Sequence, residues 1–259
     1  MEEAARNLYA VGARPDALTN CLNFGNPEEP KVLGQFAEVV RGIAESARAL
    51  DMAVPSGNVS FYNGGLGRAV MPTPVVMGTG IVRDIRRATT TDLKTEGDPL
   101  YVVGATAPEI GGSLYARQRK LQGFRIPPTD PRRLRVLGER LLRAQARGCV
   151  RAVHDVSDGG LAVALPEMAF GGGLGFSVDL AALGVDTPTS AVAVEGRSRW
   201  VVEVDSGKTE AFEDIFHGQP VAPIGGVTAS GGHFRWNSRD LLTLDLSRLY
   251  SQWRAGFDV

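Results

Sequence analysis

Residues 88–98, ATTTDLKTEGD, form a polar stretch without helical or strand periodicity between two segments that carry apolar patterns. Such a stretch is typical of a connection between folding units. We therefore place a domain boundary there and expect one domain over residues 1–92 and a second over residues 97–250. At 259 residues the chain is long enough for two domains that each bury a core.

The second segment alternates between strand patterns and helix patterns. Asp130-Pro131 predicts a helix start, because Asp can cap a helix and Pro loses no hydrogen bond at the first helical position. Gly148 predicts the end of that helix. We expect helices at 113–121, 132–148, 161–170 and 208–216, and strands at 99–106, 149–153, 174–180, 199–204, 221–227 and 233–245. This alternation indicates a layered α/β or α+β domain.

The first segment has one long amphipathic helix and few strands. Residues 31–50 predict the helix, and apolar residues share one of its faces at helical spacing: Phe36, Val40, Ile43, Ala47 and Leu50. An extended pattern follows at residues 52–63, and residues 73–82 predict a buried strand. A sheet this small leaves an apolar face or an open edge, so we expect dimerisation or pairing with a missing stretch of chain.

Composition narrows the class of protein. The formal net charge of −1 gives no electrostatic support for a nucleic-acid or lipid-surface partner. The two cysteines, Cys21 and Cys149, lie far apart in apolar settings, so we expect two buried thiols rather than a disulfide or a metal site. Neither a secretory leader nor an apolar run of membrane-spanning length is evident, and we expect a cytoplasmic protein.

Two polar stretches stand out in the first segment, and the second of them carries no charge. ALTNCLNFGNPEEP (17–30) and SGNVSFYN (56–63) can be read as a strand that ends in a turn and as an edge strand. They also suit a ligand site: Gly57 would let a phosphate approach the backbone, and Asn58 would offer a neutral oxygen to Mg²⁺. Ser60 would project from the same strand face as Asn58. Spacing alone leaves both interpretations open.

A second polar stretch, HDVSDGG (154–160), precedes a helix in the second segment. Residues this close in sequence rarely converge as a catalytic triad, so we do not expect His154 to be a catalytic base. Ser157 or Asp158 could cap the helix, or an acidic loop could hold Mg²⁺ beside a nucleotide. Phosphate binding at the glycine-opened helix start would use Asp155, Ser157, Asp158, Gly159 and Gly160. FGGGLGF (170–176) lacks dinucleotide-loop spacing and predicts a tight connection.

Five stretches resemble, in order along the chain, the formylglycinamide ribonucleotide amidotransferase family, also called phosphoribosylformylglycinamidine synthase II: GARPDALTNCLNFGNPEEP, VPSGNVSFYN, PTPVV, GGSLYARQ and VHDVSDGGLAVALPEMAFGGGLGFSVDL. The family belongs to the ATP-binding superfamily of aminoimidazole ribonucleotide synthetase. The resemblance implies an N-type domain, which is half of a dimeric β-barrel with flanking helices, followed by a C-type α/β domain. It also implies that the chain is the second of two such pairs.

The resemblance implies a function in purine biosynthesis. Family members use ATP and Mg²⁺ to activate the formamide oxygen of formylglycinamide ribonucleotide, and ammonia from a glutaminase subunit then gives the amidine, ADP and phosphate. The family's catalytic-histidine segment has no counterpart here, so we expect no catalytic residue in this chain and no activity from the chain alone. The implied partners are the missing N-terminal half, the glutaminase subunit and a small bridging subunit.

The same resemblance assigns roles to residues. Asn20 and Gly57 would bind ATP, Asn58 would bind Mg²⁺, and Ser60 would contact the substrate. Asn20 departs from the acid common at its position, and Gly64 stands where a Glu is common. The loop at 154–160 would be an auxiliary nucleotide-phosphate loop. Two further matching positions, Glu195 and Arg199, could equally form a structural ion pair.

Two other functions remain open. One is a non-catalytic half that binds nucleotide and supports assembly. The other is a different enzyme of the superfamily, such as aminoimidazole ribonucleotide synthetase, selenophosphate synthetase or thiamine-phosphate kinase. The stretch NCLNFGNPEEP (20–30) argues against the latter because it is particular to the amidotransferase. If the chain is expressed alone, we expect a homodimer.

Overall fold

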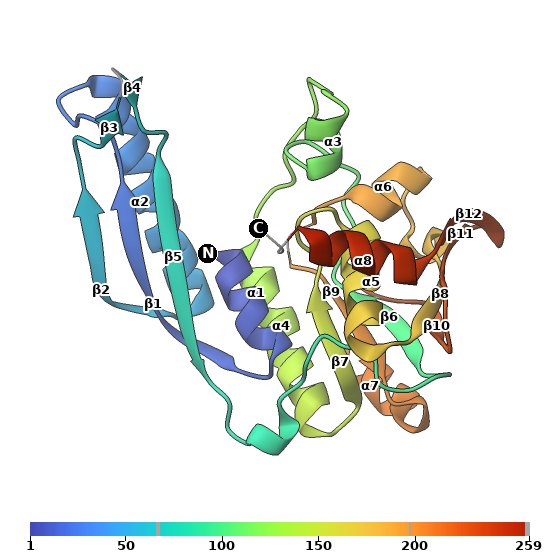
Figure 1. Ribbon diagram of the computed structural model, residues 1–259. Helices are drawn as coiled ribbons and strands as arrows, with labels where there is room; N and C mark the ends of the chain where they lie inside the picture. Colours follow the sequence, from blue (N-terminus) through green and yellow to red (C-terminus); the bar gives the residue numbers. More distant parts are fainter. Residues whose placement is uncertain (66–67, 197, 257–259) are drawn as a thin grey trace.

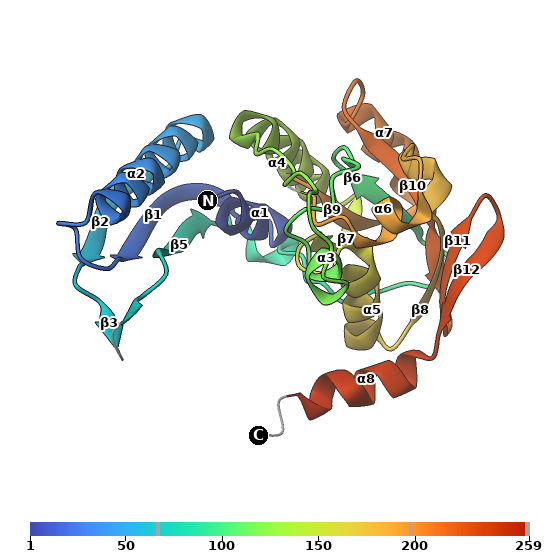
Figure 2. The same cartoon turned by 90° about the horizontal axis from the view of Figure 1, so that it is seen from above.

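The computed structural model describes residues 1–65, 68–196 and 198–256 (Figure 1). Its described strands form a three-stranded sheet in the order β2-β1-β5, a seven-stranded sheet in the order β12-β11-β8-β10-β6-β9-β7, and a small pair, β3-β4. The first and second sheets lie on opposite sides of the molecule, with helices α1 and α4 between them (Figures 1 and 2). The mixed α/β architecture agrees with the expected fold class.

The first region contains one long helix and three main strands. Its elements are α1 (Glu2–Ala10), β1 (Arg14–Asn23), α2 (Pro30–Leu50), β2 (Ala53–Ser60), β3 (Gly64–Gly65), β4 (Arg68–Ala69), β5 (Thr73–Ile81) and the 3₁₀ turn η1 (Ile85–Arg87).

The second region confirms the predicted alternation of strands and helices. Its elements are β6 (Pro99–Val103), α3 (Leu114–Gln118), α4 (Pro131–Ala146), β7 (Val150–Asp155), α5 (Leu161–Gly172), β8 (Gly175–Asp179), η2 (Leu180–Leu183), α6 (Pro188–Ala193), β9 (Trp200–Val204), η3 (Ser206–Lys208), α7 (Thr209–Ile215), β10 (Val221–Thr228), β11 (Gly232–Trp236), β12 (Arg239–Leu244) and α8 (Leu246–Ala255). The sequence analysis assigned no structure to the segment that forms α8.

Local sequence explains how α4 begins and ends. The side chain of Asp130 accepts a hydrogen bond from the backbone N–H of Arg133 at 2.9 Å, and Pro131 is the first helical residue, as predicted. Gly148 has a φ of +65°, the left-handed conformation that favours glycine after a helix. The helix therefore starts and stops where its own residues require.

The three-stranded sheet is covered on one face only. Strand β1 lies in the middle, parallel to β2 and antiparallel to β5. Helix α2 covers one face. There Phe24, in the loop that follows β1, packs edge-on against Phe36 of α2, with the ring centroids 5.3 Å apart. Val75 and Met77 of β5 are 54 % and 58 % exposed, so the expectation of a buried strand at 73–82 is wrong for this chain.

The inward face of α2 agrees with the predicted one at four of five positions, because Phe36, Ile43, Ala47 and Leu50 all pack against a core cluster. Val40, which was expected on the buried face, is 41 % exposed. Val32 is buried, and Val39 packs against the small cluster that Val32 forms with Leu22 and Phe24. The face follows the position of β1, which helical periodicity alone does not specify.

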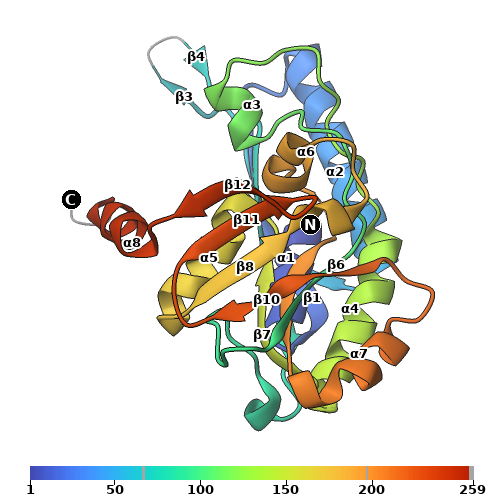
Figure 3. The ribbon, with the colours of Figure 1, turned by 90° about the vertical axis from the view of Figure 1, so that its right-hand side faces the viewer.

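The seven-stranded sheet is covered on both faces. Figure 3 shows α4 and α7 on one face and α5 on the other. Every residue of the inner strand β9 is buried. Helix α1, although first in the chain, packs on the α4 side: Tyr9 stacks edge-on against Trp200 at 6.4 Å, and the Trp200 indole donates to the carbonyl of Arg6 at 3.1 Å. The chain's N-terminal helix is thus part of the second region's core.

The environments of two predicted features differ. Cys149 is buried as expected, whereas Cys21 is only half-buried, so the prediction of two buried thiols is wrong for Cys21; both thiols are free. The glycine-rich end of α5 is a tight connection as predicted. A Cβ on Gly172, the last residue of the helix, would lie 2.2 Å from the Leu93 carbonyl oxygen.

Candidate functional site

Asn20 and Gly57 are neighbours across strands β1 and β2. The two residues are partners in the parallel register. A Cβ placed on Gly57 would lie 2.8 Å from Oδ1 of Asn20, closer than real Cβ contacts come. A side chain at position 57 would therefore displace the Asn20 amide, which lies over one face of Gly57, and position 57 is otherwise exposed. Exposed backbone of this kind is what a phosphate needs for close approach.

Asn58 and Ser60 lie on the opposite sheet face from Asn20 and Gly57. Successive strand residues point to opposite faces, and the contacts agree: the Asn58 amide nitrogen lies 3.5 Å from Sγ of Cys21, the residue that follows Asn20. The four predicted residues thus form two pairs rather than one cluster: Asn20 and Gly57 lie on one face of the sheet, and Asn58 and Ser60 lie on the other. On the face of Asn58 and Ser60, the side-chain oxygen Oδ1 of Asn58 has no hydrogen-bond partner among the described residues, and Asn58 is exposed.

The hydroxyl of Ser60 is held in place by Asn63. It donates to the Asn63 Oδ1 atom at 3.1 Å, while the Asn63 amide donates to the carbonyls of Ser60 at 2.9 Å and Phe24 at 3.1 Å. One side chain therefore ties the end of β2 to the loop that follows β1. This positioning role of Asn63 was not predicted from the sequence.

The loop at 154–160 is organised by Arg6, a residue to which the sequence analysis gave no role. Arg6 is 4 % exposed and donates to Oδ2 of Asp155 at 3.0 and 3.1 Å and to the Ser157 hydroxyl at 3.1 Å. Its only signal in the sequence is the alternation of apolar and polar residues in 2–10. The pairing joins positions 149 residues apart, which no local pattern reveals.

The helix that follows this loop has no side-chain cap. Helix α5 begins at Leu161, its N-cap is Gly160, and no side chain accepts a hydrogen bond there. The expectation that Ser157 or Asp158 caps the helix is therefore wrong. Gly159 and Gly160 have φ values of +80° and +66°, so glycine's conformational freedom makes this turn possible.

A carboxylate already binds one amide of this loop. Oε1 of Glu195 accepts hydrogen bonds from the backbone N–H groups of Gly159 at 2.8 Å and Leu114 at 2.5 Å. An anion at this end of α5 would therefore meet an amide that Glu195 already occupies. Beside it lies a cavity of about 440 Å³ between α1 and the loop, lined by residues that include Glu2, Arg6, Ser157, Asp158 and Glu195.

Glu195 does not pair with Arg199. Among the ion pairs of the described residues none joins them, so the alternative of a structural ion pair is wrong. Arg199 is fully buried and donates instead to the hydroxyl of Thr106 at 2.8 Å and the carbonyl of Val194 at 2.5 Å. Burial, together with the positive charge of Arg6, lowers the pKa of Arg199 to about 9.

His154 is committed to Glu167. Its Nε2 lies 3.1 Å from Oε2 of Glu167 and its Nδ1 lies 2.7 Å from the carbonyl oxygen of Asp155. Burial lowers the pKa of His154, but these two hydrogen bonds and the nearby carboxylates outweigh it, so the pKa lies above its ordinary value. Both ring nitrogens of His154 are therefore engaged by acceptors of this chain.

Two absences among the described residues set further limits. No group of three or more His, Cys, Asp or Glu side chains in the described part of the chain is arranged to hold a metal ion. Within the same residues, no helix combines the length and apolar character that crossing a bilayer requires.

Two family models match the chain. The model described as AIR synthase related protein, N-terminal domain, matches residues 1–82, and the corresponding C-terminal domain model matches residues 95–237.

Relatives agree on one protein. The chain is 42 % identical over 250 residues to phosphoribosylformylglycinamidine synthase subunit PurL of Thermococcus kodakarensis, covering 95 % of this chain and 34 % of the relative. It is 41 % identical over 267 residues to the PurL subunit of Moorella thermoacetica, covering 99 % of this chain and 35 % of the relative. The chain thus spans about a third of the length of the curated relatives it matches.

Solved structures share the fold. Thermotoga maritima PurL in complex with FGAR superposes with a TM-score of 0.79 at 19 % identity, covering 96 % of this chain and 42 % of that one. The same protein has been solved with ATP, with a TM-score of 0.76 at 19 % identity, covering 96 % and 40 %. Escherichia coli HypE, a hydrogenase maturation protein, gives 0.72 at 22 % identity, covering 94 % and 77 %.

Proposed function

The chain belongs to the AIR synthase related family, and we propose that it is part of a PurL-type synthetase. In this proposal the complete enzyme converts formylglycinamide ribonucleotide, ATP and ammonia into formylglycinamidine ribonucleotide, ADP and phosphate. The observation that carries the proposal is the 42 % identity to a PurL subunit, which extends over 95 % of this chain and so includes both predicted domains. HypE shares the fold but is 22 % identical, so it supports the fold alone.

The chain would supply one of the two N-type and C-type pairs of the synthetase. Coverage of about a third of each relative supports this division. The engagement of His154 with Glu167 supports it further, because that imidazole is not available as the missing catalytic base. The catalytic histidine would then come from the rest of the enzyme. We place the domain limits at residues 1–92 and 97–250.

The residues of this chain would act by positioning. The exposed Gly57 backbone, beside the Asn20 amide, would receive ATP phosphates, and the Ser60 hydroxyl, oriented by Asn63, would contact the substrate. Because β2 is the edge strand of its sheet, ATP that lies along this edge would meet Asn20 and Gly57 on one face and Asn58 on the other. The reaction would transfer the γ-phosphoryl group of ATP to the formamide oxygen, and ammonia would then displace phosphate. Phosphoryl transfer depends mainly on alignment and charge neutralisation, which suits a site without acids or bases.

Mg²⁺ fits Asn58 only in part. Mg²⁺ prefers oxygen ligands and usually keeps several waters beside substrate phosphates. The Asn58 carbonyl oxygen is exposed and has no partner among the described residues, so it could be one such ligand. The other ligands would come from ATP, from water and from the rest of the enzyme. When bound, Mg²⁺ would neutralise charge on the ATP phosphates.

The uncovered face of the three-stranded sheet would pair with a similar sheet. Val75 and Met77 are exposed there beside the polar residues of β1 and β2. In the complete enzyme the partner sheet would belong to the other N-type domain, and in the isolated chain it would belong to a second copy. Light scattering coupled to size-exclusion chromatography tests this: we expect a dimer, and a monomer at micromolar concentration would contradict it.

Complementation tests the proposed activity. Ammonia-dependent ADP release with formylglycinamide ribonucleotide would be measured for this chain alone and then with the remaining part of the synthetase added. We expect turnover only after complementation. Turnover by the lone chain would contradict the divided active site. ATP binding without turnover in either case would favour the non-catalytic nucleotide-binding half instead.

Asn58 can be tested against a neighbour on the same strand and face. Asn58→Ala should weaken Mg·ATP binding by the complemented enzyme about tenfold, the loss expected for one polar contact. Ser56→Ala is the control, because Ser56 also faces the open side, where its hydroxyl lies 3.0 Å from that of Thr19. Isothermal titration calorimetry measures both affinities. Equal affinities in the two variants would remove Asn58 from the site.

A further inference from the structure

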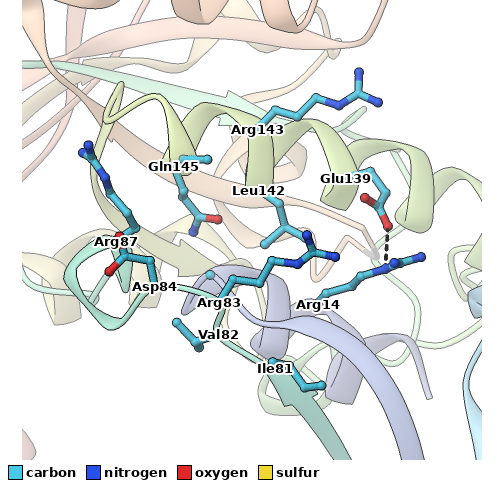
Figure 4. Close-up of a pocket in the computed structure, with 12 residues that line it drawn as sticks. Arg14, Ile81, Val82, Arg83, Asp84, Arg87, Glu139, Leu142, Arg143 and Gln145 are labelled. Atoms are coloured by element: carbon cyan, nitrogen blue, oxygen red, sulfur yellow. Dashed lines mark ion pairs between the residues drawn. The ribbon is translucent and has the colours of Figure 1, made fainter.

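A groove of about 320 Å³ lies between the turn at residues 81–87 and helix α4 (Figure 4). Near the C-terminal end of α4 it is lined by Gln145 and Ala146. Strand β7 begins at Val150, just after α4 ends, and finishes at Asp155. The groove therefore lies near the start of β7, and the loop at 154–160 lies at its end. None of the residues proposed above to bind ATP, Mg²⁺ or substrate lines this groove.

Positive charge exceeds negative charge along the groove. Its lining contains two carboxylates, Asp84 and Glu139, and four arginines, Arg14, Arg83, Arg87 and Arg143. Both carboxylates are already paired: Asp84 accepts from Arg86 at 2.9 Å, and Glu139 forms an ion pair with Arg14, with Oε1 of Glu139 3.3 Å from Nε of Arg14. The guanidinium group of Arg83 makes no ion pair or hydrogen bond with the described residues.

Arg83 and Arg14 extend into the groove from its sheet side. In Figure 4 the Arg83 side chain runs beside Leu142 toward Arg14 and Glu139, whereas the guanidinium groups of Arg87 and Arg143 point away from the groove. Apolar side chains, among them Ile81 and Leu142, form the walls. A cleft with apolar walls and an excess of one charge concentrates its field, so an anion here would be attracted more strongly than on open surface.

The floor of the groove contains a buried acceptor without a donor. Gln145 is 3 % exposed, and its amide nitrogen donates to the carbonyls of Tyr9 at 3.1 Å and Ala10 at 3.0 Å and to the Thr89 hydroxyl at 2.8 Å. The Thr89 hydroxyl itself donates to Ala10, which fixes it as an acceptor for Gln145. The amide orientation is therefore determined, and the carbonyl oxygen of Gln145 has no partner in the described part of the chain.

We propose that this groove binds a small phosphorylated compound that also carries a hydroxyl or amino group. The phosphate lies between Arg83 and Arg14, because guanidinium groups donate in a fork that matches phosphate oxygens. The hydroxyl or amino group donates to the free carbonyl oxygen of Gln145. The volume of about 320 Å³ suits a compound of sugar-phosphate size.

Calorimetric titration of the full chain with ribose 5-phosphate and with inorganic phosphate tests the proposal. Ribose 5-phosphate should bind more tightly, because only it supplies hydroxyl donors for Gln145. Arg83→Ala should weaken ribose 5-phosphate binding about tenfold, as expected for the loss of a charge-assisted contact. Arg132→Ala is the control: Arg132 is an exposed arginine of α4 that makes no ion pair among the described residues and does not line the groove.

A gain of affinity provides the sharper test. Glu139→Gln removes the negative charge next to Arg14, while the amide oxygen of the new side chain can still accept from Arg14, so ribose 5-phosphate should bind several-fold more tightly. Asn58→Ala should leave this binding unchanged, which separates the groove from the proposed ATP site. The proposal is overturned if Arg83→Ala and Arg132→Ala have equal effects, if Glu139→Gln does not tighten binding, or if both phosphates bind equally.

Discussion

The two main sheets of this chain have very different surroundings. All five residues of β9 are buried, whereas seven of the eight residues of β2 are exposed. Helices cover both faces of the seven-stranded sheet, but α2 covers only one face of the three-stranded sheet (Figure 2). Helix α1 of the first region completes the core on one face of the seven-stranded sheet, whereas the described residues leave the other face of the three-stranded sheet uncovered.

The helices of the two regions differ in the same way. Helix α4 is packed against α1 so closely that Gly138 touches the Tyr9 ring, whereas a Cβ added to Gly34 or Gly42 of α2 would meet no atom within 4 Å. A helix–helix contact packed at this density has no room for an added atom, whereas an open helix surface has room for one. Mutations that probe core density should therefore have opposite effects in the two regions.

The largest contrast is expected from truncating one large apolar side chain in each region. Trp200→Ala should lower the free energy of unfolding by about 3–5 kcal/mol, because a fully buried ring and its contact with Tyr9 are lost. Met77→Ala should change it by less than about 0.5 kcal/mol in a monomeric sample, because Met77 is 58 % exposed. Urea denaturation followed by circular dichroism measures both. A comparable loss for Met77→Ala would mean that β5 is covered.

The next contrast uses one substitution in two helices. Gly138→Ala should destabilise the chain by about 1–3 kcal/mol, because the added Cβ would lie 2.4 Å from the Tyr9 ring. Gly42→Ala should stabilise it by about 0.5–1 kcal/mol, because alanine favours helix and nothing lies within 4 Å of its Cβ. Thermal and urea unfolding give both values. A destabilising Gly42→Ala would show that α2 is more closely packed than its contacts indicate.

Local chemistry made part of the fold predictable. Asp130-Pro131 and Gly148 set the ends of α4 because capping, proline and positive φ act within a few residues. Strand alternation placed Asn58 and Ser60 on one face for the same reason. Burial of β5 was predicted wrongly, because its apolar pattern encodes a covered strand without encoding which chain provides the cover.

Contacts between distant residues were beyond the sequence. Arg6 pairs with Asp155 across 149 positions, and the motif around Asp155 gives no sign that its charge is matched from the first helix. The separation of Asn20 and Asn58 onto opposite faces depends on the register of β1 against β2, which two isolated motifs cannot fix. Glu195 likewise reaches Gly159 only because the fold brings α3, α5 and the segment after α6 together.

The smallest contrast is in pH dependence, since all three histidines lie in the second region. The pKa of His154 is raised chiefly by Glu167 and Asp155 against the opposing effect of burial, and the hydrogen bond to His154 lowers the pKa of Glu167. The stability contributed by His154 is thus fully present below its unfolded pKa and is lost as pH rises through its folded pKa; that contributed by Glu167 is lost as pH falls through its own folded pKa.

Glu167→Gln should therefore cost more stability at about pH 6 than at about pH 9, because only the protonated imidazole gains from the carboxylate. Urea unfolding of both proteins at each pH measures the difference. Trp253 gives a local signal, because its indole donates to Glu167 at 3.3 Å and its emission should change over the same pH range. Glu210→Gln, an exposed acid on α7 without an ion pair among the described residues, is the control. A cost that is equal at both pH values would mean that His154 does not change its protonation between them, which would contradict the prediction.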